Sequence, residues 1–299
     1  MSYTNRHAFL VMAHTQPDLL IRLLKRLDHE KVDVFLHLDK KSDINIEDIK
    51  NVLCKSNLFI TERIRVSWGA YSCVHAEYLL LKEATSKGSY CHYHLISGQD
   101  YLLQNIEIIL DYYNSNRDTN YISFKNDEVD YYIDRLKWNY FFQELVGRNH
   151  GVLFFLQSLL IKIQKAVNRK RTIPDNVSFG SMYYDITDGF ARWIVDNYND
   201  WKPFFTNTVC PDEFFIQTLF STYLKEHDGK LCHQEEEDYQ TINRAEMSIC
   251  RAIDWKRGNP HIWTENDYDM LRSSGLFFAR KVDAVKSKAL LDILDETKG

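Results

Sequence analysis

The first half of the chain alternates short apolar runs with amphipathic stretches, and this alternation constrains the fold more than any other feature. Residues 8–13 form a continuous apolar run, which is typical of a strand buried on both faces. Residues 17–27 then place leucines at helical spacing, and a second apolar run covers residues 32–38. Alternation at this spacing predicts an α/β fold with a mostly parallel central sheet and helices on both faces.

The same pattern continues further along the chain. It predicts strands at 57–61, 93–97, 121–124 and 183–187, and helices at 46–53, 70–84, 105–113, 151–167, 189–198 and 212–225. His14, Asp39 and Asp100 follow predicted strands, so we expect them at the carboxyl edge of the sheet, where such folds bind nucleotides. The acidic run at 235–238 is predicted to be a solvated loop.

Composition narrows the choice of partners. The net charge of −5 argues against nucleic acid, because a phosphate backbone requires a basic surface. The six cysteines are scattered without a Cys-x-x-Cys pair, so neither a zinc site nor a disulfide framework is predicted. No apolar run approaches the roughly 18 residues that a membrane span requires.

A pair of carboxylates opens the helix predicted at 212–225. Pro211 suits the first helical position, and Asp212 and Glu213 follow it in the first turn. The helix dipole favours negative charge there, and we expect it to keep a carboxylate ionised. An ionised carboxylate fixed at a helix start is a candidate general base. Alternatively, the two acids only stabilise the first turn.

Seven stretches together carry a family resemblance. They are residues 7–14, 33–42, 66–74, 93–101, 180–183, 211–213 and 276–283. In this order they resemble the core-2/I-branching N-acetylglucosaminyltransferase and peptide O-xylosyltransferase family, glycosyltransferase family 14. The resemblance implies a GT-A-like nucleotide-sugar fold in one glycosyltransferase domain, 1–299. Its nucleotide-binding half would be 1–125, and its acceptor and catalytic half 126–299. Residues 127–177 match no part of the family pattern.

The resemblance also implies an activity. Members transfer N-acetylglucosamine or xylose from a UDP-sugar to an acceptor hydroxyl, with inversion and without a metal. For this chain it implies a UDP-sugar donor, no cofactor and a glycan or lipid-linked saccharide acceptor, in cell-surface polysaccharide synthesis. Animal members lie behind a membrane anchor, whereas this chain enters its first strand at once, with no room for a signal peptide. We therefore expect a cytoplasmic, bacterial-type member.

Individual roles follow from the same resemblance. Glu213 corresponds to the catalytic base, while Asp212 and Ser181 would orient the acceptor. Lys281 corresponds to one of the basic residues that neutralise the diphosphate leaving group. Arg257 is the candidate for the second, with Lys256 or Arg280 as alternatives.

Four further residues are expected on the donor side. Asp39 resembles the family residue that binds uracil or ribose, although a turn carboxylate is the alternative. Trp68 and Tyr71 lie in a segment that the family uses near the nucleotide. The alternative, equally compatible with the sequence, is that Trp68 is buried and anchors the sheet. Asp100 would orient donor or acceptor hydroxyl groups, unless it is a satisfied loop carboxylate.

Two other function classes remain open. A metal-dependent sugar nucleotidyltransferase would share the sheet, but the one Asp-x-Asp, at 267–269, reads as a helix start, and we predict no metal site. The apolar helix at 151–167 ends in the basic run 168–171. That stretch is either a core helix with a solvated end or a peripheral contact with the inner face of the cell membrane. By itself it would suit a non-catalytic, membrane-associated module.

Overall fold

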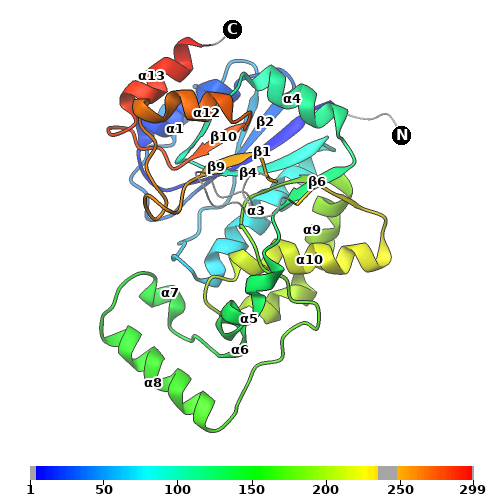
Figure 1. Ribbon diagram of the computed structural model, residues 1–299, viewed down its shortest axis with the longest axis vertical. Helices are drawn as coiled ribbons and strands as arrows, with labels where there is room; N and C mark the ends of the chain where they lie inside the picture. Colours follow the sequence, from blue (N-terminus) through cyan, green and yellow to red (C-terminus); the bar gives the residue numbers. More distant parts are fainter. Residues whose placement is uncertain (1–4, 235–247, 298–299) are drawn as a thin grey trace.

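The computed structural model describes residues 5–234 and 248–297, so the predicted loop at 235–238 lies outside the described residues. A seven-stranded sheet has the order β3-β2-β1-β4-β7-β6-β8 (Figure 1). Its strands are β1 (His7–Ala13), β2 (Val32–Leu38), β3 (Asn57–Ile60), β4 (His92–Ser97), β6 (Thr119–Ile122), β7 (Tyr184–Thr187) and β8 (Lys230–Leu231). Only β7 runs antiparallel to its neighbours β4 and β6. The predicted α/β fold with a mostly parallel sheet is therefore confirmed.

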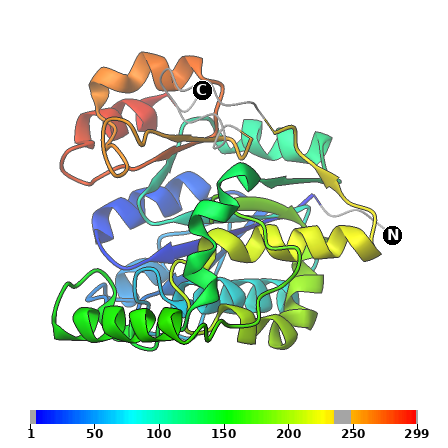
Figure 2. The ribbon, with the colours of Figure 1, turned by 60° about the horizontal axis from the view of Figure 1, so that its bottom comes forward.

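Two hydrophobic cores cover the two faces of this sheet. Along β1, Phe9 and Val11 pack into one core, and Ala8 and Leu10 into the other, because successive side chains of a strand point to opposite faces. The first core is covered by α1 (Pro17–Leu27), α4 (Ile106–Ser115), α12 (Tyr268–Ser273) and α13 (Lys288–Glu296). The second is covered by α3 (Tyr71–Lys87), α9 (Asp188–Phe205) and α10 (Asp212–Glu226). Figure 2 shows the sheet between these layers.

A small second sheet brings the end of the chain to the carboxyl edge of the main sheet. Its strands are β5 (Asp100–Leu102), β10 (Phe278–Arg280) and β9 (Arg251–Ile253). Arg280 pairs with Asp100 in its antiparallel ladder. Residues far apart in the sequence, 100 and 280, therefore meet beside the end of β4.

The segment after β6 contains short helices that project from the lower part of the molecule in Figure 1. They are η1 (Asn126–Glu128), α5 (Val129–Tyr132), α6 (Asp134–Lys137), α7 (Gln143–Val146) and the longer α8 (Val152–Ala166). Across the described ranges, no helix is long and apolar enough to cross a membrane.

Two predicted helices differ in length, and a third prediction is confirmed. The helix expected at 46–53 is the single turn α2 (Glu47–Lys50), and α9 extends well beyond residue 198. The Asp-x-Asp does mark a helix start. Asp267 ends η2 (Glu265–Asp267) and forms a capping box with Thr264, so its carboxylate is engaged by backbone and hydroxyl groups.

Candidate active site

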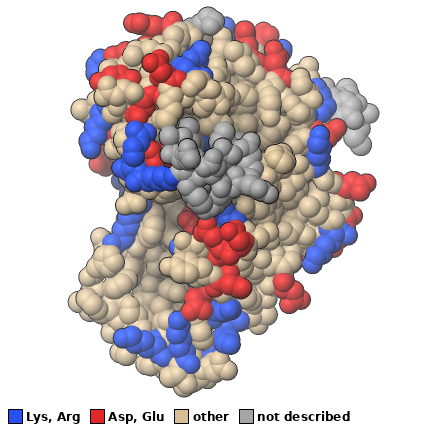
Figure 3. Space-filling model, viewed as in Figure 1, with Lys and Arg blue, Asp and Glu red and all other residues tan. Residues whose placement is uncertain are grey.

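A cavity of about 890 Å³ lies between the body and the segment that carries α7 and α8. The molecule is hollowed there, on the left of Figure 3. The polar and aromatic lining includes Trp68, Lys125, Arg148, Ser181, Asp212, Glu213, Arg280 and Lys281. The structure thus brings together six residues that the sequence singled out, with Arg280 as an alternative to Arg257: Trp68, Ser181, Asp212, Glu213, Arg280 and Lys281.

Close backbone contacts fix the start of α10 in the cavity wall. Cys210, just before the helix, has a φ of 49°, and its N–H donates to the Gly69 carbonyl at 2.8 Å. On the other side, the Gly180 N–H donates to the Glu213 carbonyl at 2.9 Å. A Cβ on Gly180 would lie 2.0 Å from the Ser123 carbonyl oxygen, so only glycine fits there. Two separate segments, around Gly69 and Gly180, therefore fix the backbone at the start of α10.

The Glu213 carboxylate forms an ion pair with Arg135 of α6. The Arg135 guanidinium also lies 4.1 Å from the ring centroid of Tyr132. This pair leaves the Glu213 side chain 37% exposed, so the carboxylate is oriented and yet accessible from the cavity. The sequence did not indicate Arg135, because it falls in the stretch 127–177 that matches no family pattern.

The Asp212 carboxyl is influenced by burial and by the charge of its neighbour Glu213. Burial, and then the charge of Glu213, raise the pKa of Asp212 to about 7. Its Oδ1 is buried without a hydrogen-bond partner among the described residues. Glu77 of α3 is fully buried near it, and burial, followed by the Asp212 charge, raises the pKa of Glu77 well above its usual value. Burial therefore favours the neutral form of the Asp212 carboxyl more than water does.

Basic side chains gather in the cavity lining. Burial lowers the pKa of Lys281, and the charges of Arg280 and Arg148 lower it further. Among the residues described, no carboxylate lies within ion-pair distance of the Lys281 ammonium group. Arg148 sits 4.8 Å from the ring centroid of Trp68, which is half exposed. A lysine near two arginines, without an ion pair of its own, is suited to an anionic ligand.

Asp39 and Asp100 do not line the cavity, but they lie next to its basic residues. Asp39 follows β2, and its Oδ1 accepts from the Lys41 N–H at 2.8 Å. Burial lowers the pKa of His14. The charge of Asp39 opposes this shift and the charge of Lys281 adds to it, so both side chains lie near His14. Asp100 accepts from Arg280 at 2.8 Å and thereby fixes the guanidinium.

Two predicted residues are engaged elsewhere. The Tyr71 hydroxyl hydrogen-bonds to the hydroxyl of Tyr198 in α9. Arg257 forms ion pairs with Asp254 and, at 2.7 Å, with Asp267, and neither Tyr71 nor Arg257 lines the cavity. Of the alternatives to Arg257, it is Arg280 that lines the cavity.

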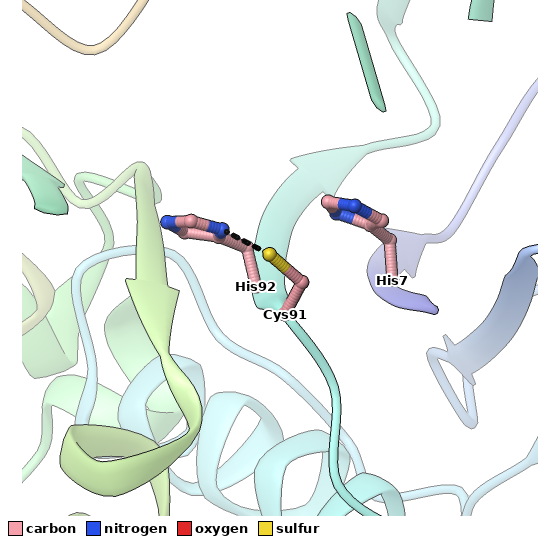
Figure 4. A group of neighbouring side chains, drawn as sticks. All are labelled: His7, Cys91 and His92. Atoms are coloured by element: carbon pink, nitrogen blue, oxygen red, sulfur yellow. Dashed lines mark hydrogen bonds between the residues drawn. The ribbon is translucent and has the colours of Figure 1, made fainter. Parts of the chain in front are cut away.

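A cluster at the opposite end of the strands is the one group of described residues with metal-ligand geometry (Figure 4). His7 begins β1, and Cys91 and His92 lie at the start of β4. The Cys91 Sγ is 3.4 Å from His92 Nδ1, and His92 Nε2 lies 2.8 Å from the Thr119 carbonyl. All three side chains are buried in the core, away from the cavity. The spacing in the sequence did not indicate this cluster.

Comparison with known proteins agrees with the sequence motifs. The family model described as Core-2/I-Branching enzyme matches residues 7–274, which confirms the predicted resemblance. Xylosyltransferase 2 of Homo sapiens is 23% identical over 311 residues, covering 97% of this chain and 33% of that protein. Xylosyltransferase 2 of Rattus norvegicus is 22% identical over 309 residues, with the same coverage. The chain thus spans about a third of the length of these relatives.

Similarity to solved structures is weaker. TarS of S. aureus superposes with a TM-score of 0.28 and 13% identity, covering 37% of this chain and 20% of that one. HddC from Yersinia pseudotuberculosis gives a TM-score of 0.27 and 16% identity, covering 40% of this chain and 64% of that one.

Proposed function

Because the chain belongs to the Core-2/I-branching enzyme family, we propose that it is an inverting glycosyltransferase that uses a UDP-sugar and needs no metal. UDP-N-acetylglucosamine is the first candidate donor and UDP-xylose the second. The acceptor is a hydroxyl of a glycan, in the synthesis of a cell-surface polysaccharide. One observation carries the proposal: Glu213 shares a single cavity with Lys281, Arg280 and Arg148.

Glu213 is the proposed general base. Its carboxylate takes the proton of the acceptor hydroxyl while the acceptor oxygen forms a bond to the anomeric carbon of the donor. The bond between that carbon and the diphosphate breaks at the same time, and UDP leaves with the electron pair. Attack opposite the leaving group inverts the anomeric centre. The ion pair with Arg135 holds Glu213 in one orientation, which favours a fixed geometry for the reacting atoms.

Lys281 and Arg280 are the proposed contacts of the leaving diphosphate. Fixed positive groups near developing negative charge stabilise a transition state strongly. Arg280 takes the place first expected for Arg257, because Arg280 lines the cavity and Arg257 does not. Asp39 is proposed to bind the ribose or uracil, and Trp68 to cover the nucleotide or sugar.

The test is nucleotide binding with and without divalent metal. Calorimetry should detect UDP binding to the purified chain in EDTA, and a panel of sugar nucleotides should show which donor is hydrolysed. Failure to bind UDP at millimolar concentration would overturn the proposal. Activity that disappears in EDTA and returns with manganese would instead support a metal-dependent enzyme, such as a sugar nucleotidyltransferase.

A further inference from the structure

Helix α8 is attached to the body through polar side chains. Only Gln157 and Gln164 of this helix are buried, and their separation of two turns places them on one face. Gln157 accepts from the Phe142 N–H at 3.0 Å and donates to Gln143 at 3.0 Å. Gln164 accepts from the Asn139 N–H at 2.9 Å and donates to its carbonyl at 3.0 Å. The inward face of α8 is therefore a hydrogen-bonding face.

The outward face is apolar. The residues that form this outer face, with their exposed fractions, are Val152 (76%), Phe155 (67%), Leu156 (45%), Leu159 (53%), Ile163 (49%) and Val167 (65%). A helix on a water-soluble surface normally turns its apolar side chains toward the core. A contiguous exposed apolar surface of this kind marks an interaction site. The alternative of a buried core helix, left open by the sequence, is therefore wrong.

Charge indicates what covers the outer face. Residues 148–171 contain six Lys or Arg and no Asp or Glu, in a chain whose net charge is −5. Lys162, Arg169 and Lys170 are exposed, and basic atoms gather near the lower end of the molecule in Figure 3. Apolar side chains flanked by cations are typical of helices that lie in the interface of anionic membranes. We propose that the outer face of α8 binds an anionic lipid bilayer.

The same helix connects this surface to the reaction site. Phe154, Gln157, Ser158 and Ile161, on the other side of α8, line the cavity that holds Glu213. A bilayer on the outer face would therefore lie one helix diameter, roughly 10 Å, from the cavity. The acceptor is then a lipid-linked saccharide presented at the membrane surface, an inference that rests on the proposed function.

Arg171 is excluded from the basic residues to be tested. Its guanidinium donates to the carbonyls of Pro203 at 2.8 Å and Phe204 at 3.1 Å, and also to that of Thr206, at the end of α9. Substitution of Arg171 would disturb the attachment of the whole segment. Lys162, Arg169 and Lys170 can be changed together without this complication.

Vesicle flotation at low salt tests the proposal. The full chain should float with vesicles of phosphatidylcholine and phosphatidylglycerol, and less with phosphatidylcholine alone. The double variant Phe155→Ser, Leu159→Ser should reduce the bound fraction about tenfold or more, because it removes apolar insertion. The triple variant Lys162→Gln, Arg169→Gln, Lys170→Gln should abolish the preference for anionic vesicles.

Controls make the outcome decisive. Ile108→Ser replaces an equally exposed apolar residue on α4 and should float like the wild type. Wild-type protein that fails to float, or an outer-face variant that floats unchanged, overturns the proposal. So does a wild-type dimer that the double variant dissociates, since a second copy would then cover the face. Circular dichroism of the same samples shows whether the variants are folded. Absence of UDP binding by the wild type alongside intact flotation would refute only the proposed function.

Discussion

Replacing Lys281 by Ala tests whether the basic residues that line the cavity bind a diphosphate. The Lys281 charge already acts on Arg280, Arg148 and His14, so it lies among the groups that would meet a diphosphate. A hydrogen bond to a charged group contributes about 1.5–3 kcal/mol. Lys281→Ala should therefore weaken UDP binding about ten- to a hundredfold. Uridine has no diphosphate, and its affinity should stay the same.

Isothermal calorimetry with UDP and uridine measures both affinities. Lys286→Ala is the matched control, because Lys286 is exposed and lies five residues further along the chain. The difference between UDP and uridine should be largest at low ionic strength, since salt screens the charge. Equal weakening of UDP and uridine by Lys281→Ala would refute a diphosphate contact and indicate a general loss of the site.

Two further predictions concern the architecture around Glu213. Burial raises the pKa of Asp212 to about 7 in the folded chain, so its contribution to stability is present at low pH and is lost as the pH rises through about 7. Asp212→Asn should therefore raise the urea midpoint at pH 8 more than at pH 5, and an equal effect at both would contradict this. Gly180→Ala should destabilise the fold by about 1–3 kcal/mol in urea, because its Cβ would meet the Ser123 carbonyl. Gly88→Ala, with open space around it, is the control and should cost much less.

The sheet and the family were predictable because they depend on local pattern. Apolar runs such as residues 8–13 identify buried strands without any tertiary information, and the segment 211–213 lies within a motif. The direction of β7 was not predictable, because antiparallel pairing with β4 is decided by the long crossover through residues 123–183.

The site differs from the sequence-based expectation where tertiary contacts decide what a side chain does. Arg257 and Arg280 have the same chemistry, and only the fold shows that Asp254 and Asp267 engage the former. For Asp212, burial raises the pKa, and the packing that buries a first-turn carboxyl is not visible in the sequence. The sequence of α8 has a polar and an apolar face, but it does not show which face points outward. The orientation depends on Gln157 and Gln164, which accept hydrogen bonds from backbone N–H groups in residues 139–142.

The most direct measurement compares sugar transfer with UDP binding in Glu213→Gln. We expect normal UDP affinity and a transfer rate about a hundred- to ten-thousandfold lower, because a general base is lost and the nucleotide contacts are kept. Glu226→Gln, at the exposed far end of the same helix, should transfer normally. Asp212→Asn should lower the transfer rate less than Glu213→Gln does. An inactive Asp212→Asn beside an active Glu213→Gln would contradict the assignment and transfer the role of base to Asp212.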